Sequence, residues 1–328
     1  MASVDAHRPP LSHPASFADL FEAICRSIAT VIRGKNDVIG LAVAAMLAEG
    51  HLLVEDVPGV GKTSLAKALA TATGGTFGRL QFTPDLLPTD VVGTSIWNQR
   101  DARFEYRPGP IFANVLLADE INRASPKTQS ALLEAMAEGQ VTADGTTRAL
   151  PAPFMVIATQ NPLEHHGTYA LPESQLDRFL MKVSVGYPDR AHELELLSTD
   201  GGEPALEELT PVVGPDTVLG LAHAARSVHV SAPLAAYLLD LAAASRAHPH
   251  LVLGVSPRAV LGLQRVMRVW AAAHGRDYTT PDDAKALAVP VLAHRIAVAP
   301  GAAVQGIDAD GVVRELLRAV PVPSEARP

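Results

Sequence analysis

The 328-residue sequence lacks the features that mark secreted and membrane proteins. Cys25 is its only cysteine, so no internal disulfide can form, which suits a reducing compartment. No apolar run reaches the roughly 18–20 residues that a membrane helix needs. The longest run, 38–54, is interrupted by Glu49, His51 and two glycines. The first residues show no basic segment followed by an apolar one, as a secretory signal would. These absences predict a cytoplasmic protein without membrane insertion.

Positive charge is also scarce. The chain has 27 Lys and Arg against 35 Asp and Glu, a net charge of −8, and a sequence pI near 5.8. This balance argues against a protein whose main partner is nucleic acid, because non-specific binding to nucleic acid needs a basic surface. Hydrophobic residues make up 48% of the chain, so a sizeable core is expected. The length fits about two domains.

The rest of the sequence is organised around residues 54–64, Val-Glu-Asp-Val-Pro-Gly-Val-Gly-Lys-Thr-Ser. An apolar run at 51–54 precedes them, and the helix-forming segment 65–70 follows. This order of strand, glycine-bearing loop and helix is the phosphate-binding P-loop pattern. It predicts nucleotide binding by Pro58, Gly59, Val60, Gly61, Lys62, Thr63 and Ser64.

The residue types of this loop follow from its chemistry. Gly59 and Gly61 allow the backbone to turn with its N–H groups toward phosphate oxygens. A helix that begins near Lys62 adds the positive end of its dipole. Lys62 is expected to reach the β- and γ-phosphates of ATP, and the Thr63 hydroxyl to bind Mg²⁺. The motif departs from its usual form at Asp56, which replaces the first glycine.

An acidic pair supplies the other half of a nucleotide-hydrolysing site. The apolar run 114–118 indicates a central strand buried on both faces, and Asp119 and Glu120 follow at its carboxyl end. Ligands of open α/β sheets bind at that end. Asp119 is therefore expected to bind Mg²⁺, and Glu120 to polarise the water that attacks the γ-phosphate.

Two predicted β-hairpins interrupt the regular order of strands and helices. The first pairs 95–97 with 103–106, and the second turns at Asp144-Gly145, a pair that favours a tight turn. Further strands are predicted at 79–82, 154–159 and 179–185, and further helices at 17–32, 38–48 and 126–138.

These elements predict an α/β fold in which a parallel sheet is sandwiched by helices. From residue 189 onward strand signals largely vanish and alanine-rich helices follow, which predicts a smaller all-α domain. We expect a flexible tail over 1–16, an α/β nucleotide-binding domain over 17–187 and an α-helical domain over 188–328 that ends in a short tail.

The order of motifs resembles that of AAA+ ATPases, and specifically the MoxR family, from about residue 17 to 296. The two hairpins resemble the insertions of this branch, which does not depend on the missing glycine. The residues that carry the resemblance are Asp56-Val57-Pro58-Gly59-Val60-Gly61-Lys62-Thr63, Asp119-Glu120-Ile121-Asn122-Arg123-Ala124-Ser125-Pro126-Lys127, Thr159-Gln160-Asn161-Pro162, Leu176-Asp177-Arg178-Phe179 and Ser256-Pro257-Arg258.

The resemblance implies further site residues. Asn161 matches the first sensor, which hydrogen-bonds the attacking water or the γ-phosphate. Arg178 matches the arginine finger, which projects into the ATP site of a neighbouring subunit. Arg258 matches the second sensor at the start of a lid helix, and Arg123 either reaches across the subunit interface or pairs with a neighbouring acid. Residues 31–34 are expected to border the adenine. A finger that acts in trans implies a ring, and the family implies a hexamer.

The resemblance also implies a chaperone-like role, in which ATP hydrolysis remodels or activates a protein client, often with a partner that bears a von Willebrand factor A domain. Three alternatives stay open: the ATPase subunit of a metal chelatase, a DNA-translocating motor, and a nucleotide-bound scaffold without turnover. His165-His166 beside Glu164 could suggest a metal site, but a loop is the simpler interpretation, because metal ligands need fixed spacing.

Overall fold

The computed structural model describes residues 16–162, 168–188, 190–198 and 203–323. The predicted tail therefore lies almost entirely outside the described residues, as do Glu164, His165 and His166. Within them, no helix is both long and apolar enough to cross a membrane.

A five-stranded parallel sheet forms the centre of the α/β part, with the order β2-β5-β8-β1-β9. Neighbours in the sheet are distant in sequence, as expected when helices connect parallel strands. The strands β1, β2, β5 and β8 confirm the predicted ones. The strands are β1 (Leu52–Glu55), β2 (Phe77–Gln81), β5 (Val115–Asp119), β8 (Met155–Gln160) and β9 (Met181–Val183).

The last strand is shorter than predicted, because the chain leaves the sheet after Val183. Ser184 Oγ and the Gly186 N–H both donate to the Asp56 carboxylate, at 3.0 and 2.6 Å. These bonds direct residues 184–186 toward the predicted P-loop instead of continuing the ladder with β1.

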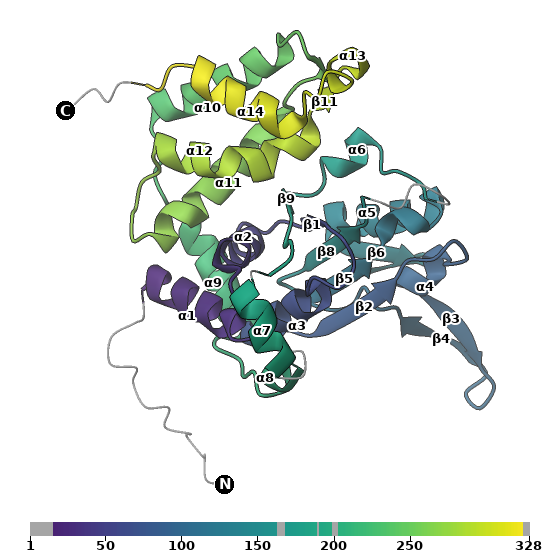
Figure 1. Cartoon of the computed structure of the whole chain (residues 1–328). Helices are drawn as coiled ribbons and strands as arrows, with labels where there is room; N and C mark the ends of the chain where they lie inside the picture. The colour runs from purple at the N-terminus through teal and green to yellow at the C-terminus, as the bar shows by residue number, and fades with distance from the viewer. Residues whose placement is uncertain (1–15, 163–167, 189, 199–202, 324–328) are drawn as a thin grey trace.

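Both faces of the central strands β1, β5 and β8 are buried, as their continuous apolar residues predict. Alternate residues enter different cores: Leu52 packs in the core with α1 (Phe17–Ala29), α2 (Asn36–Leu47) and α3 (Lys62–Ala72), whereas Leu53 packs in the core with α5 (Pro126–Glu138). The period of two follows from the pleat of a strand. The helix-sandwiched parallel sheet is confirmed (Figure 1).

Both predicted hairpins are present. β3 (Gly93–Asn98) pairs with β4 (Arg103–Pro108) after the short α4 (Pro88–Val92), and β6 (Gln140–Ala143) pairs with β7 (Thr146–Ala149). Asp144 and Gly145 have φ of 53° and 73°, as a tight hairpin turn requires. The first hairpin projects away from the sheet (Figure 1).

Most of the later helices form a helical domain, which packs against α1 and α2 through α11, whereas α8 contacts α3 (Figure 1). One short antiparallel pair, β10 (Leu251–Leu253) with β11 (Ala297–Val298), adds to the helices. The helices are α7 (Arg190–Ser198), α8 (Glu203–Glu207), α9 (Pro215–Ala225), α10 (Ala232–Arg246), α11 (Pro257–Ala273), α12 (Pro281–Leu292), α13 (Pro300–Ala303) and α14 (Ala309–Ala319), and α6 (Glu173–Leu176) precedes β9.

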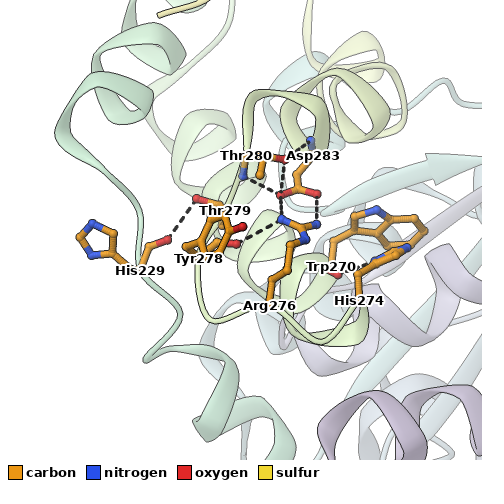
Figure 2. A network of polar contacts seen from close by, with 8 residues as sticks. All are labelled: His229, Trp270, His274, Arg276, Tyr278, Thr279, Thr280 and Asp283. Atoms are coloured by element: carbon orange, nitrogen blue, oxygen red, sulfur yellow. Dashed lines mark hydrogen bonds and ion pairs between the residues drawn. The ribbon is translucent and has the colours of Figure 1, made fainter. Parts of the chain in front are cut away.

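A polar network fixes the turn between α11 and α12 (Figure 2). Arg276 binds both carboxylate oxygens of Asp283, at 2.6 and 2.8 Å, and Asp283 also accepts from the Thr280 N–H and hydroxyl. Thr280 caps α12 in return, because its side chain accepts from the Asp283 N–H. The Thr279 N–H donates to the His229 carbonyl, which ties this turn to the segment between α9 and α10.

Candidate functional site

A cavity of about 640 Å³ lies at the carboxyl end of β1, where the chain turns into α3. All seven predicted nucleotide-binding residues, 58–64, line it. So do three residues from the ends of the neighbouring strands, Asp119, Glu120 and Asn161. Segments far apart in sequence therefore meet at one edge of the sheet. Val31, Ile32 and Arg33, within the segment expected to border adenine, also line the cavity.

The loop that borders this cavity has the backbone that its glycines predict. Gly59 and Gly61 adopt φ of 85° and 91°, a region that costs other residues free energy. Gly61 is the N-cap of α3, and the residues of the first helical turn, whose N–H groups have no partner within the helix, line the cavity, as anion binding requires. The Lys62 ammonium donates to the Asp56 carbonyl at 2.8 Å, at the mouth of the same loop.

Asp56, the departure from the usual motif, has a structural role that glycine could not fill. Its side chain is buried; Oδ1 accepts from the Val57 N–H at 3.0 Å, and Oδ2 accepts from Ser184 and Gly186. These bonds join the loop to the segment that leads into the helical domain. The sequence alone did not predict this connection, because its partners lie about 130 residues away.

The acidic pair is oriented by a buried hydroxyl. Thr159 on β8 donates to Oδ1 of Asp119 at 2.7 Å, and its oxygen accepts the Glu120 N–H at 2.9 Å. Glu120 is left-handed, with φ of 55°, so the chain turns sharply just after β5. The carboxylates of Asp119 and Glu120 therefore have fixed orientations at the end of β5. The Asp119 side chain is 14% exposed and the Glu120 side chain 23% exposed.

Two side chains of β2 complete the surroundings of the acidic pair. Arg79 Nη2 lies 2.9 Å from Asp119 Oδ2, and Gln81 Nε2 donates to Glu120 Oε2 at 2.7 Å. Arg123 pairs with the same oxygen of Glu120 at 2.8 Å. Sequence reasoning missed Arg79 and Gln81, although polar residues at i and i+2 of a strand beside β5 were the available signal.

Residues that follow β9 also contribute to the cavity. Its lining includes Pro188, His192 on α7 and Leu206 on α8. None of the three was predicted, because their sequence context carries no binding motif. A ligand in the cavity would therefore touch the loop of residues 58–64 and segments that lie more than 120 residues later in the chain.

Arg178 and Arg258 lie outside the cavity: neither is among the described residues that line it. Arg178 precedes β9 and donates to the Leu133 carbonyl on α5. Because β1 and β9 are parallel, the start of β9 lies beside His51, at the amino end of β1. The cavity lies at the carboxyl end of β1, and the length of this strand separates the two ends by about 10 Å. Arg258, at the start of α11, lies on the same side, since Ser256 donates to Asp177 at 3.2 Å.

Comparison with known proteins agrees with this arrangement. Residues 51–181 match the model of the ATPase family associated with various cellular activities (AAA), and residues 243–316 match the AAA lid domain. The chain is 39% identical to Chaperone MoxR1 of Mycobacterium tuberculosis (strain ATCC 25618 / H37Rv) over 97% of this chain and 87% of that protein. It is 35% identical to Protein MoxR of Paracoccus denitrificans over 82% and 86% of the two chains.

The chain belongs to the MoxR family of AAA+ ATPases. It is also 50% identical to the uncharacterized protein YeaC of Bacillus subtilis (strain 168), over 89% of this chain and 92% of that one. A solved structure of a Cytophaga hutchinsonii ATCC 33406 protein, described as an ATPase, superposes with a TM-score of 0.88 at 37% identity, over 94% and 96% of the two chains. This MoxR-family protein is thus a nucleotide-binding, ATP-hydrolysing enzyme.

The cavity of this MoxR-family ATPase fits Mg²⁺ by its donor chemistry. Mg²⁺ prefers oxygen ligands and binds through one or two carboxylates together with substrate phosphates and water. The Thr63 hydroxyl and the Asp119 carboxylate both line the cavity next to the loop that would hold the phosphates. They are the residues that would hold the metal, which would neutralise charge on the phosphoryl oxygens.

Proposed function

We propose that this protein hydrolyses ATP with Mg²⁺ in sites shared between neighbouring subunits of a ring, most simply a hexamer. One observation carries the proposal: Arg178 and Arg258 lie at the amino end of the sheet, whereas the cavity lies at its carboxyl end. A head-to-tail interface places one end of a subunit against the other end of the next. Both arginines would then reach the ATP of a neighbour.

The residues that line the cavity divide the work within a subunit. Lys62 and the N–H groups of the loop bind the phosphates, and Thr63 and Asp119 hold Mg²⁺. Glu120 accepts a proton from the attacking water, which Asn161 orients. Arg178 and Arg258 of the neighbour then stabilise the negative charge that develops on the transferred phosphoryl group.

Nucleotide state would move the helical domain relative to the sheet. We place the boundary of this lid at residue 187/188, just after Gly186, whose φ is 65°. Asp56 joins the P-loop to that point, and His192 and Leu206 border the same cavity from the lid. Such motion supports remodelling of a protein client, with a partner that bears a von Willebrand factor A domain. A cytoplasmic location stays a prediction.

Mixing two inactive variants tests the shared site. In Arg178→Ala the cavity is intact but the finger is lost, whereas Glu120→Gln keeps the finger and loses the base. Each alone should be inactive. In a one-to-one mixture, random head-to-tail assembly pairs an intact cavity with an intact finger at about one quarter of the sites. The ATPase rate should recover to about that fraction of wild type, with size-resolved mass confirming assembly.

A mixture that stays as inactive as its components, although both variants assemble and bind ATP, would contradict the shared site. Lys127→Ala controls for the loss of a positive charge in Arg178→Ala. Lys127 lies on α5 and outside the cavity lining, so this variant should remain active. Two alternative functions can be tested with the wild-type ring. Co-purification with a large porphyrin-binding subunit would favour a chelatase, and DNA-stimulated hydrolysis would favour a translocating motor.

A further inference from the structure

Arg79 is a cationic side chain of the cavity to which neither the P-loop nor the acidic pair assigns a role. It lies on β2, lines the cavity beside Lys62 and Thr63, and forms an ion pair with Asp119 at 2.9 Å. The Arg79 side chain is 49% exposed, whereas that of Asp119 is only 14% exposed. The pair therefore joins one partner that has room to move to one that is enclosed.

Protein groups engage both carboxylate oxygens of Asp119, but they hold them differently. Oδ1 accepts from the Thr159 hydroxyl at 2.7 Å, and Thr159 is fully buried on β8. Oδ2 accepts from Arg79, whose long side chain reaches in from the neighbouring strand. Thr159 therefore fixes the orientation of the Asp119 carboxylate. Arg79 is the counter-ion of this carboxylate, and another cation can replace it.

A divalent cation that approaches Asp119 must compete with Arg79 for the carboxylate. Two cations on one enclosed carboxylate repel each other, and this repulsion is stronger in the cavity than in water. An enclosed carboxylate without any cation is also unfavourable, because its charge loses hydration. The arrangement therefore favours one cation at a time.

We propose that Arg79 is a positioning residue that competes with Mg²⁺ for Asp119. The inference rests on the Mg²⁺-dependent function proposed above. When Mg²⁺ arrives with the nucleotide, the Arg79 guanidinium leaves Asp119 and remains within the cavity that holds the phosphates. When Mg²⁺ leaves with ADP, Arg79 returns, so Asp119 keeps a counter-ion throughout. The competition lowers the affinity for Mg²⁺·ADP and speeds product release.

The adjacent contact on the same strand shows what is particular to Arg79. Gln81, two residues on, faces the same way and donates to Glu120, yet it is neutral. It can orient a carboxylate without competing with a metal for charge. Of these two β2 contacts to the acidic pair, only the one to Asp119, the predicted metal ligand, is made by a cation.

Nucleotide affinity with and without Mg²⁺ isolates this competition from hydrolysis. The dissociation constant of a fluorescent ADP analogue is measured on the full chain, first with a chelator and then with saturating Mg²⁺. The ratio of the two constants is the Mg²⁺ coupling. For Arg79→Gln we expect the coupling to rise about two- to fivefold over wild type, the effect of losing a half-exposed ion pair. Dissociation of Mg²⁺·ADP should slow by a similar factor.

Two further variants act as controls. Arg79→Lys keeps the cation and should stay near the wild-type coupling. Arg103→Gln removes one positive charge from an exposed ion pair with Glu105, also 2.9 Å long but on the β3–β4 hairpin outside the cavity, and should leave the coupling unchanged. Thermal melting checks that each variant is folded, and Arg79→Ala provides a second neutral substitution.

The outcomes are separable. A coupling in Arg79→Gln and Arg79→Ala equal to that of wild type would overturn the inference. A lower coupling would do so as well, since it would mean that Arg79 orients Asp119 for the metal. If wild-type protein hydrolyses ATP equally fast with and without Mg²⁺, the Mg²⁺-dependent function fails, whatever coupling the variants show.

Discussion

We expect His51 to make the folded protein less stable in acid. Its ring is buried at the start of β1, where Nδ1 accepts the Val156 N–H at 3.1 Å and the opposite nitrogen, Nε2, donates to the Met136 carbonyl at 3.0 Å. These two bonds require the neutral ring. Burial lowers the pKa of His51 from 6.5 to about 4; the bond to Met136 opposes the shift, and the charges of Arg258 and Arg265 add to it.

His294, two residues after the end of α12, adds a second group of the same kind. Its Nε2 donates to the Phe179 carbonyl at 2.9 Å, just before β9. Burial, reinforced by the adjacent Arg295, lowers the pKa of His294 to about 3. Both histidines therefore stay neutral in the folded protein at pH values where the unfolded chain is already protonated.

The magnitude follows from proton linkage. Above pH 6.5 both rings are neutral in the folded and the unfolded chain, so they add no pH dependence. Below pH 6.5 the unfolded chain binds protons that the folded chain does not, and each histidine lowers the free energy of unfolding by about 1.4 kcal/mol per pH unit. Between pH 7.5 and 5.0 the loss is about 2 kcal/mol for each, and about 4 kcal/mol together.

Urea unfolding at pH 7.5 and 5.0 measures this loss. His51→Gln can still accept from Val156 and donate to Met136 but does not titrate. The variant should therefore lose about 2 kcal/mol less than wild type between the two pH values. The exposed His223→Gln on α9 is the matched control and should behave as wild type. An equal loss in His51→Gln and wild type would refute the assignment of acid sensitivity to the buried ring.

Three further substitutions test other parts of the structure. Glu120→Gln should bind ATP with at most a few-fold change in affinity and lose hydrolysis; turnover as fast as wild type would contradict its role as base. Asp56→Ala should destabilise the P-loop by about 1–3 kcal/mol, because two donors near Gly186 lose their acceptor, and calorimetry should find weaker nucleotide binding; unchanged binding would rule out that coupling. Asp283→Asn should lower the free energy of unfolding by about 3 kcal/mol in urea titrations, because Arg276 loses its enclosed partner; a loss under 1 kcal/mol would show that the pair contributes little.

Local patterns in the sequence were enough to predict most of the fold. Apolar runs without alternation predicted strands buried on both faces, and Leu52 and Leu53 indeed enter different cores. Gly59 and Gly61 predicted the loop, since only glycine enters their backbone region without strain. Asp144-Gly145 predicted a hairpin, because its tight turn needs a positive φ at both residues, which Asp tolerates and Gly adopts freely. These features depend on residues within a few positions of one another.

The candidate site was predictable only in part. Lys62, Thr63 and Asp119 come together because parallel strands end at the same edge, which the order of elements already implies. By contrast, the residues that surround the acidic pair come from strands whose order in the sheet no local pattern fixes. Arg79 reaches Asp119 only because β2 pairs with β5.

The sequence by itself therefore predicted which residues bind and hydrolyse a nucleotide, because that chemistry requires particular side chains at short, fixed spacings. The tertiary structure decided which of them share a cavity. It separated Arg178 and Arg258 from the P-loop by the length of a strand, and it joined Asp56 to Gly186 across about 130 residues. Such pairings depend on strand order and packing, and these are properties of the whole chain rather than of any one segment.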